Sequence, residues 1–132
     1  MVHPSLEIWE KKLKEVLDEL DDFLEDNYGD RYRLHPARAR RGKTSNKAQD
    51  GLFDIAALFS MGAGSDHGKG YVIDVHMVTL QHIPEEVRNE IETVTLQKLQ
   101  ESLPKYFPGK NLKVDKDGNV IKIYGDLSLG LL

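Results

Sequence analysis

Residues 111–124 read NLKVDKDGNVIKIY, and this stretch decides the fold. Its Asp117-Gly118 dipeptide is a strong signal for a two-residue type I′ turn between antiparallel strands. A turn at this place pairs Val114 with Ile121 and puts the apolar residues of both strands on one face, because side chains alternate along a strand. We therefore predict a β-hairpin over residues 111–124.

A second hairpin is predicted upstream of the first. The stretches LFDIAALFS (52–60) and YVIDVHMVTL (71–80) are rich in β-branched and aromatic residues, and turn-forming residues flank both. The glycine-rich segment MGAGSDHGKG (61–70) joins them and reads as an extended loop. We expect this hairpin to span residues 52–80, with the apolar residues of its two strands on a shared face.

Two helices complete the pattern. In residues 5–27 apolar side chains recur every three or four positions, which is the period of one helix face. A second helix is predicted over residues 84–103, because Pro84 and the two glutamates after it favour a helix N-terminus, and Pro104 is expected to end it. The order α-β-β-α-β-β predicts an α+β fold, in which both helices pack on one face of a four-stranded, largely antiparallel sheet.

The bulk composition fits one soluble domain over residues 1–132. The chain has no Cys, which excludes disulfides and thiolate metal sites. No apolar run approaches the ~18 residues of a membrane-spanning helix, and the N-terminal residues lack the basic and apolar regions of a signal peptide. We therefore expect a cytoplasmic protein without membrane contact, and the sequence leaves any cofactor undetermined.

The segment between the first helix and the first strand, residues 30–51, has no regular period and reads as a long loop. Residues 31–47 hold seven Lys or Arg residues and no acid, whereas residues 1–30 hold ten acids and three Lys. Loops of this length are usually functional or disordered. Two kinds of anion fit this one: a ligand, or the acidic helix of the same protein, within one chain or between the subunits of a homo-oligomer.

Our leading prediction is that an anionic, phosphate-bearing small molecule binds between the basic loop and the glycine-rich loop. Arg and Lys side chains hold phosphate and carboxylate groups, and the candidate ligand-binding residues are Arg38, Arg40, Arg41, Lys43, His67 and Lys69. Nucleic acid is less favoured, because the isoelectric point is about 5.7 and only Tyr32 adds an aromatic ring to the basic stretch. The RRGKTS stretch is not a P-loop, since Ala37 stands where the first glycine is required.

A second candidate site combines Asp54, Asp74 and His76. Asp74 and His76 are two residues apart, so they share the face of their strand that is opposite to its apolar residues. Antiparallel pairing with aligned apolar faces places Asp54 opposite His76. Such a group could act as catalytic acid and base or bind a divalent metal, and the alternative is a solvated outer sheet face. Enzyme activity is therefore left open, and the alternative to ligand binding is a non-enzymatic, homo-oligomeric interaction protein.

Overall fold

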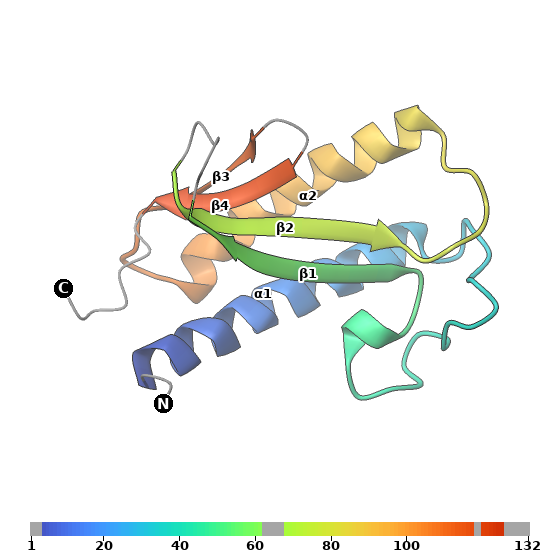
Figure 1. The fold of residues 1–132 in the computed structure, drawn as a ribbon, viewed down its shortest axis with the longest axis horizontal. Helices are drawn as coiled ribbons and strands as arrows, with labels where there is room; N and C mark the ends of the chain where they lie inside the picture. Colours follow the sequence, from blue (N-terminus) through green and yellow to red (C-terminus); the bar gives the residue numbers. More distant parts are fainter. Residues whose placement is uncertain (1–3, 62–67, 118–119, 126–132) are drawn as a thin grey trace.

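The computed structural model of the chain describes residues 4–61, 68–117 and 120–125. Within these residues, two long α-helices, one short 3-10 helix and four strands follow one another (Figure 1). They are α1 (Pro4–Tyr28), η1 (Lys47–Gln49), β1 (Phe53–Ser60), β2 (Gly70–Met77), α2 (Glu85–Tyr106), β3 (Leu112–Asp117) and β4 (Val120–Gly125). The predicted order α-β-β-α-β-β is confirmed, and η1 lies within the segment that was expected to be loop.

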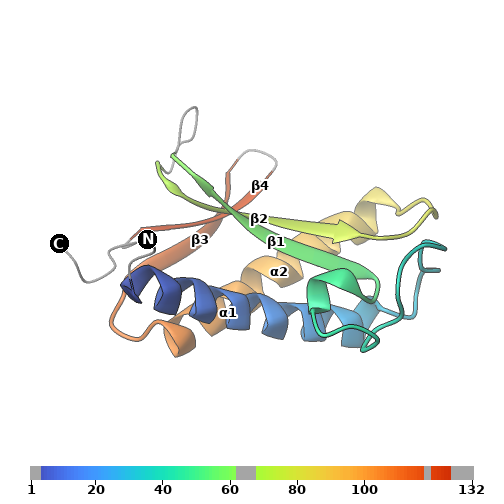
Figure 2. The same ribbon diagram turned by 60° about the horizontal axis from the view of Figure 1, so that its bottom comes forward.

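The strands form one antiparallel sheet in the order β1-β2-β4-β3. Both long helices lie on the same side of this sheet, as Figure 2 shows, with α1 against β1 and α2 against β3. This arrangement confirms the predicted α+β fold. The order also makes β1 an edge strand of the described sheet, and α1 runs alongside that edge (Figure 1).

The register of β1 and β2 is the one that the apolar pattern predicts. Asp54 lies opposite His76, and Ile55 lies opposite Val75. Odd-numbered residues of both strands face the helices, and Phe53 and Ile55 are buried there. Even-numbered residues lie on the outer face, away from the helices, because successive side chains point to opposite faces of a sheet.

The register predicted for the last hairpin is wrong by two residues. Val114 pairs with Ile123 rather than with Ile121. A shift of two residues keeps every side chain on its face, so the apolar pattern does not distinguish between the two registers. The observed register puts Asp115 opposite Lys122, and this pair of opposite charges favours it over the predicted one.

The second helix continues past its predicted end, through Pro104 to Tyr106. Proline removes one backbone N–H donor from the helix. The last turn nevertheless closes, because the N–H of Phe107 donates to the carbonyl of Leu103 at 2.8 Å. The Phe107 ring also packs on Trp9 of α1, with ring centroids 4.4 Å apart, so contact between the two helices stabilises this turn.

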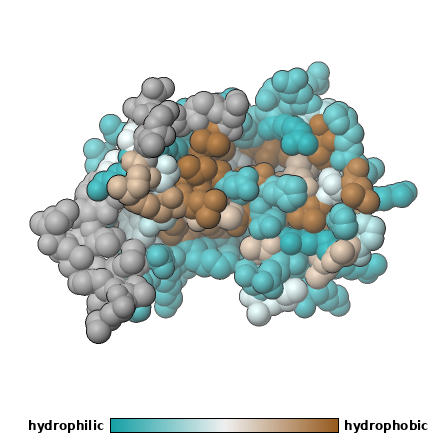
Figure 3. All heavy atoms as spheres, viewed as in Figure 1, coloured by the Kyte–Doolittle hydropathy of each residue, from teal (hydrophilic) through white to brown (hydrophobic). Residues whose placement is uncertain are grey.

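One hydrophobic core lies between the helices and the sheet. The apolar stripe of α1 supplies much of it, with buried Trp9, Leu13, Val16, Leu17, Leu20 and Leu24. The outer face of the sheet is different: Leu58 of β1 is 64% exposed, and Figure 3, which looks onto this face, shows apolar side chains at the surface. Within the part of the chain that the structure describes, no helix combines the length and apolar content needed to cross a bilayer.

Candidate functional site

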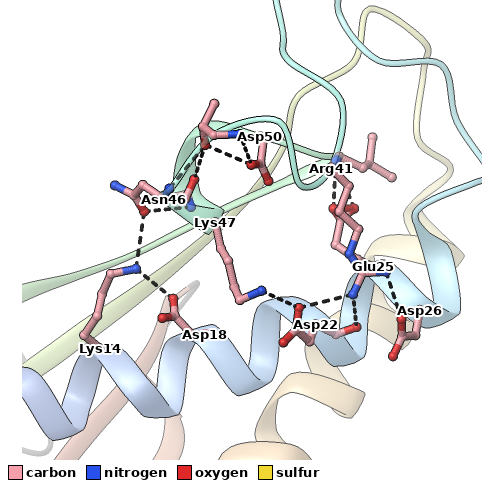
Figure 4. A network of polar contacts seen from close by, with 12 residues as sticks. Lys14, Asp18, Asp22, Glu25, Asp26, Arg41, Asn46, Lys47 and Asp50 are labelled. Carbon is pink, nitrogen blue, oxygen red and sulfur yellow. Dashed lines mark hydrogen bonds and ion pairs between the residues drawn. The ribbon is translucent and has the colours of Figure 1, made fainter.

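The basic loop, residues 31–47, is anchored on the acidic face of α1 in the same chain (Figure 4). The Arg41 guanidinium contacts Asp26 at 2.9 Å and Asp22 at 3.2 Å, and Lys47 Nζ contacts Asp22 at 2.9 Å. Burial alone would raise the pKa of Asp22, but hydrogen bonds from Lys47 and Arg41 hold that pKa below its ordinary value. The charge pattern left several partners open for this loop, and the structure shows pairing within one chain.

Arg38 does not point to an open ligand site but holds the loop against the start of β1. Its guanidinium donates hydrogen bonds to four backbone carbonyls, those of Ala48 (2.8 Å), Asp50 (3.0 Å), Gly51 (3.0 Å) and Phe53 (3.1 Å). The planar guanidinium has five N–H donors in a fixed arrangement, so it can serve four acceptors at once. Arg38 therefore serves as a structural clamp, which its predicted role as a phosphate ligand did not anticipate.

The segment that resembles the tail of a P-loop encloses a carboxylate of its own chain. Asp50 is 3% exposed, and its Oδ2 accepts hydrogen bonds from the backbone N–H of Thr44 at 3.0 Å and from its hydroxyl at 2.8 Å. Burial would raise the pKa of Asp50, but the hydrogen bonds from Thr44 and from the N–H of Gly42 lower it. The anion that this turn holds is thus an internal side chain.

The described residues of the two loops of the predicted anion site lie at opposite ends of β1. Arg40 and Lys43 lie at the ends of one turn, in which the N–H of Lys43 donates to the carbonyl of Arg40 at 3.0 Å, and both residues are exposed. Lys69 directly precedes β2, whose first residue pairs with the last residue of β1, and the eight residues of β1 span about 26 Å. His67 is outside the described residues. Binding of an anion by Arg40 and Lys43 stays a prediction.

Asp54, Asp74 and His76 share the outer face of the sheet, as the sequence predicts. Asp54 lies opposite His76 and one diagonal step from Asp74, which pairs with Ala56. Asp74 and His76 are exposed and Asp54 is half-buried. Among the described residues, no group of three His, Cys, Asp or Glu side chains is arranged to hold a metal ion. A role of these three residues in acid–base chemistry stays a prediction, on a face that is open to solvent.

A groove of about 280 Å³ lies between α1 and the edge strand β1. Its apolar lining includes Leu13, Leu17, Ile55 and Ala57. Its charged lining comes from α1 and consists of Glu10, Lys14, Asp18 and Asp21. The groove therefore combines an apolar surface with three acidic side chains and one Lys.

Lys14 is already engaged at this groove. Its Nζ donates to Asp18 Oδ1 at 2.7 Å and to Asn46 Oδ1 at 3.3 Å, so it connects α1 to the residue that caps η1 (Figure 4). The Asn46 side chain in turn accepts from the N–H of Ala48 at 3.0 Å. Lys14 thus stabilises one end of the groove and neutralises Asp18.

Asp21 is the buried acid of the groove, and it lacks a partner in the described part of the chain. Its side chain is 4% exposed, and among the described residues no hydrogen bond or ion pair reaches its carboxylate. Burial, and then the nearby charges of Glu25 and Asp22, raise its pKa to about 7. Sequence reasoning missed this residue, although its place four positions after Leu17 and three before Leu24 puts it on the apolar face of the helix.

The free edge of β1 runs along the same groove. The N–H of Val78 donates to the carbonyl of Leu52 at 2.7 Å, and hydrogen-bonded pairs then alternate along the antiparallel ladder. The backbone groups of Phe53, Ile55 and Ala57 consequently point away from β2. Among the described residues, no hydrogen bond reaches the outward N–H or C=O of Ile55 or Ala57.

The first residue of this edge is capped by side chains. The carbonyl of Phe53 accepts from Arg38, and its N–H donates to the buried carboxylate of Glu25, which also accepts from the N–H of Leu52 at 2.9 and 3.0 Å. Gly51 adopts φ +75°, and a Cβ there would overlap the Glu25 carboxylate, so only glycine fits. The edge is closed at Phe53 and open from Ile55 onward.

Comparison with known proteins identifies a family and a relative, but neither has a described function. A family described as "Uncharacterised protein" matches residues 4–125. A protein of Borreliella burgdorferi described as "Uncharacterized protein" is 38% identical over 117 residues, which cover 89% of this chain and 91% of that protein. No solved structure matches the chain. Because the family match covers residues 4–125 and the relative is 38% identical over most of both chains, the chain belongs to that family of uncharacterised proteins.

Proposed function

We propose that this protein binds an extended polypeptide segment, which adds to the free edge of β1 as a further strand of the sheet. The observation that carries the proposal is the unpaired backbone of Ile55 and Ala57 beside a groove that is lined by apolar side chains. Main-chain hydrogen bonds to an exposed sheet edge give such complexes their affinity, and pockets for alternate side chains give them specificity.

The groove lies beside the edge of β1, where an added strand would be placed. Neighbouring strands are about 4.8 Å apart, so an added strand would run along β1 and over α1. Every second side chain of that strand would face the helix side of the sheet, where Leu13, Leu17 and Ile55 line the groove. Burial of apolar side chains on this lining would add to the main-chain hydrogen bonds.

The opposite edge of the sheet supports the choice of β1 by contrast. Charged side chains, Lys in particular, protect edge strands from pairing with other chains. The edge strand β3, LKVDKD, carries charge at four of its six positions, and Lys116 is paired with Glu92 at 3.0 Å. β1, FDIAALFS, has one charged residue, and residues 55–59 have none. Of the two edges, β1 lacks protecting charges.

The test is selection of peptides on the protein and on a variant of its edge. Random twelve-residue peptides displayed on phage are panned on the immobilised chain and on Ala57→Pro. Because the N–H of Ala57 points away from β2, proline removes an edge donor without removing a ladder hydrogen bond. Leu58→Ala, on the outer face of the same strand and outside the groove lining, is the control. Peptides enriched on the wild type should bind Leu58→Ala equally and Ala57→Pro about tenfold more weakly.

A second measurement guards against misfolding of the proline variant. On the wild-type protein, a selected peptide should slow hydrogen exchange at the amides of Ile55 and Ala57, as followed by NMR. The proposal is wrong if no peptide is enriched, or if the enriched peptides leave these amides unprotected. If sedimentation instead shows a dimer in which the same two amides are already protected, the occupant is a second copy of this chain rather than another polypeptide.

A further inference from the structure

We infer that the segment bound at β1 is basic at one position, where a Lys or Arg side chain enters the groove and pairs with Asp21. The inference rests on the proposed function and adds to it the chemical class of the partner. It is carried by a buried carboxylate that no other group of the described chain satisfies, and by the charges that surround it.

The carboxylate of Asp21 opens on the groove and has no donor among the described residues. A charged group with so little exposure is usually paired in folded proteins. Asp21 is 4% exposed and lines the groove, yet among the described residues it has no hydrogen bond or ion pair. Its neighbour Asp22 shows the usual arrangement, with Lys47 at 2.9 Å and Arg41 at 3.2 Å.

The groups that face Asp21 leave it with excess negative charge. In the described part of the chain, the charges that act on Asp21 most are those of the acids Asp18, Asp22 and Glu25 on α1 and of the basic residue Lys47 on η1. Lys47 is held by Asp22. A cation that entered the groove would therefore meet a carboxylate whose charge the protein leaves uncompensated.

The rest of the groove carries the same sign of charge. Glu10 and Asp18 line it together with Asp21, against Lys14 alone, and Lys14 is held by Asp18 at 2.7 Å. An acidic side chain in the bound segment would be repelled here, and a neutral one would leave Asp21 without a partner. Charge complementarity thus selects a basic residue.

The shape of Lys and Arg fits the composition of the lining. Both side chains have long apolar stems that pack on hydrophobic surface while the charged head reaches a polar group. In the groove the stem would contact Leu17 and Ile55, and the head would reach Asp21. A small metal ion fits less well, because no three acidic or His side chains among the described residues are placed to bind one.

The test uses the peptides selected on the wild-type protein. We expect them to share a Lys or Arg at one position. One such peptide is synthesised with a fluorescent label, together with a version in which that residue is norleucine, which keeps the stem and removes the charge. By fluorescence anisotropy the norleucine peptide should bind wild-type protein about tenfold more weakly. On Asp21→Asn the two peptides should bind within about twofold of each other, since the carboxylate that distinguishes them is gone.

The matched control is Glu7→Gln, which removes an exposed acid of the same helix outside the groove lining. It should keep the full difference between the two peptides. If the selected peptides depend on Ala57 but share no basic residue, or if the norleucine version binds wild type equally well, the inference about Asp21 is wrong and binding at the β1 edge stands. If selection yields no peptide that depends on the edge, both proposals fall.

Discussion

Arg38 shows how a single side chain gives an irregular segment a defined shape. The basic loop has few backbone hydrogen bonds of its own, and the Arg38 guanidinium gathers four carbonyls from residues 48–53 around one point. Lys has three donors on a flexible stem and does not reproduce this planar fork. The clamp therefore depends on the shape of the side chain as well as on its charge.

Arg38→Lys should consequently lower the free energy of unfolding by about 2 kcal/mol, because several carbonyls lose a charged donor. Urea unfolding followed by circular dichroism measures this. Arg40→Lys is the control, since Arg40 is exposed in the same loop, and it should change stability by less than about 0.5 kcal/mol. Equal effects of the two substitutions would contradict the role given to Arg38.

Asp21 makes the stability of the protein depend on pH. Its pKa in the folded protein is about 7, above the ordinary 3.8, so the folded state holds this proton more tightly than the unfolded state does. The stability that the protonated carboxyl supplies is complete below pH 4 and is lost as the pH rises through 7. The loss corresponds to about three pKa units, which sets an upper limit of ~4 kcal/mol.

Asp21→Asn should remove this dependence, because the amide stays neutral at every pH. We expect the variant to be more stable than wild type by about 2–4 kcal/mol at pH 8, and the difference to vanish near pH 4. Urea unfolding at intervals between these values gives the comparison. Asp30→Asn, at an exposed loop position, should shift stability by the same small amount throughout. A pH-independent difference for Asp21→Asn would refute the assignment.

For single residues, the sequence predicts the type of interaction but not the partner that makes it. Seven basic residues in the loop predict a nearby anion, and the structure supplies two in Asp22 and Asp26 of the same chain. Composition alone does not separate an internal carboxylate from a ligand phosphate, since Arg binds both in the same way. Asp21 was open to detection, because an acid in an apolar helical stripe is unusual.

At the scale of elements, the acidic helix and the basic loop form one unit. Among the described residues, three ion pairs join them: Arg41 to Asp26, Arg41 to Asp22, and Lys47 to Asp22. The side chains involved are about half exposed, so each contact contributes little and salt weakens it. The loop should therefore be held by about 1 kcal/mol in these ion pairs, apart from the Arg38 clamp.

The double variant Asp22→Asn/Asp26→Asn should release the loop without unfolding the core. The loop holds several trypsin sites, among them Arg40 and Lys43, and cleavage there should become about fivefold faster, in line with a loss of 1 kcal/mol. Mass spectrometry of timed digests locates and times the cuts. Glu7→Gln, on the same helix, should leave the rate unchanged. Added salt should speed cleavage of wild type but not of the variant, after correction with a small peptide substrate.

Long periodic elements were predictable because their signals are repeated many times. The stripe of α1 supplies six apolar positions at helical spacing, and the predicted limits, residues 5–27, differ from the observed Pro4–Tyr28 by one residue at each end. Local exceptions depend on contacts that the sequence does not display. Pro104 stays helical because Phe107 packs on Trp9, and the last hairpin shifts by two residues because charge pairing joins the apolar pattern in setting its register.

At the scale of the whole molecule, the fold is one-sided. Both helices cover the same face of the sheet, so successive side chains of a strand alternate between the helix side and the outer side (Figure 2). The outer face carries Leu58 as well as the group of Asp54, Asp74 and His76. An apolar residue on such a face gives no stability unless something covers it.

Two substitutions of Leu by Ala measure this asymmetry, because they remove the same atoms from opposite sides of the molecule. Leu20 of α1 is 0% exposed in the core, and Leu20→Ala should cost about 2–5 kcal/mol in the free energy of unfolding. Leu58 of β1 is 64% exposed, and Leu58→Ala should cost less than about 0.5 kcal/mol. Urea unfolding at two protein concentrations decides the matter. A large, concentration-dependent cost at Leu58 would mean that a second copy covers the outer face in solution. The one-sided core would then be that of a protomer and not of the whole assembly.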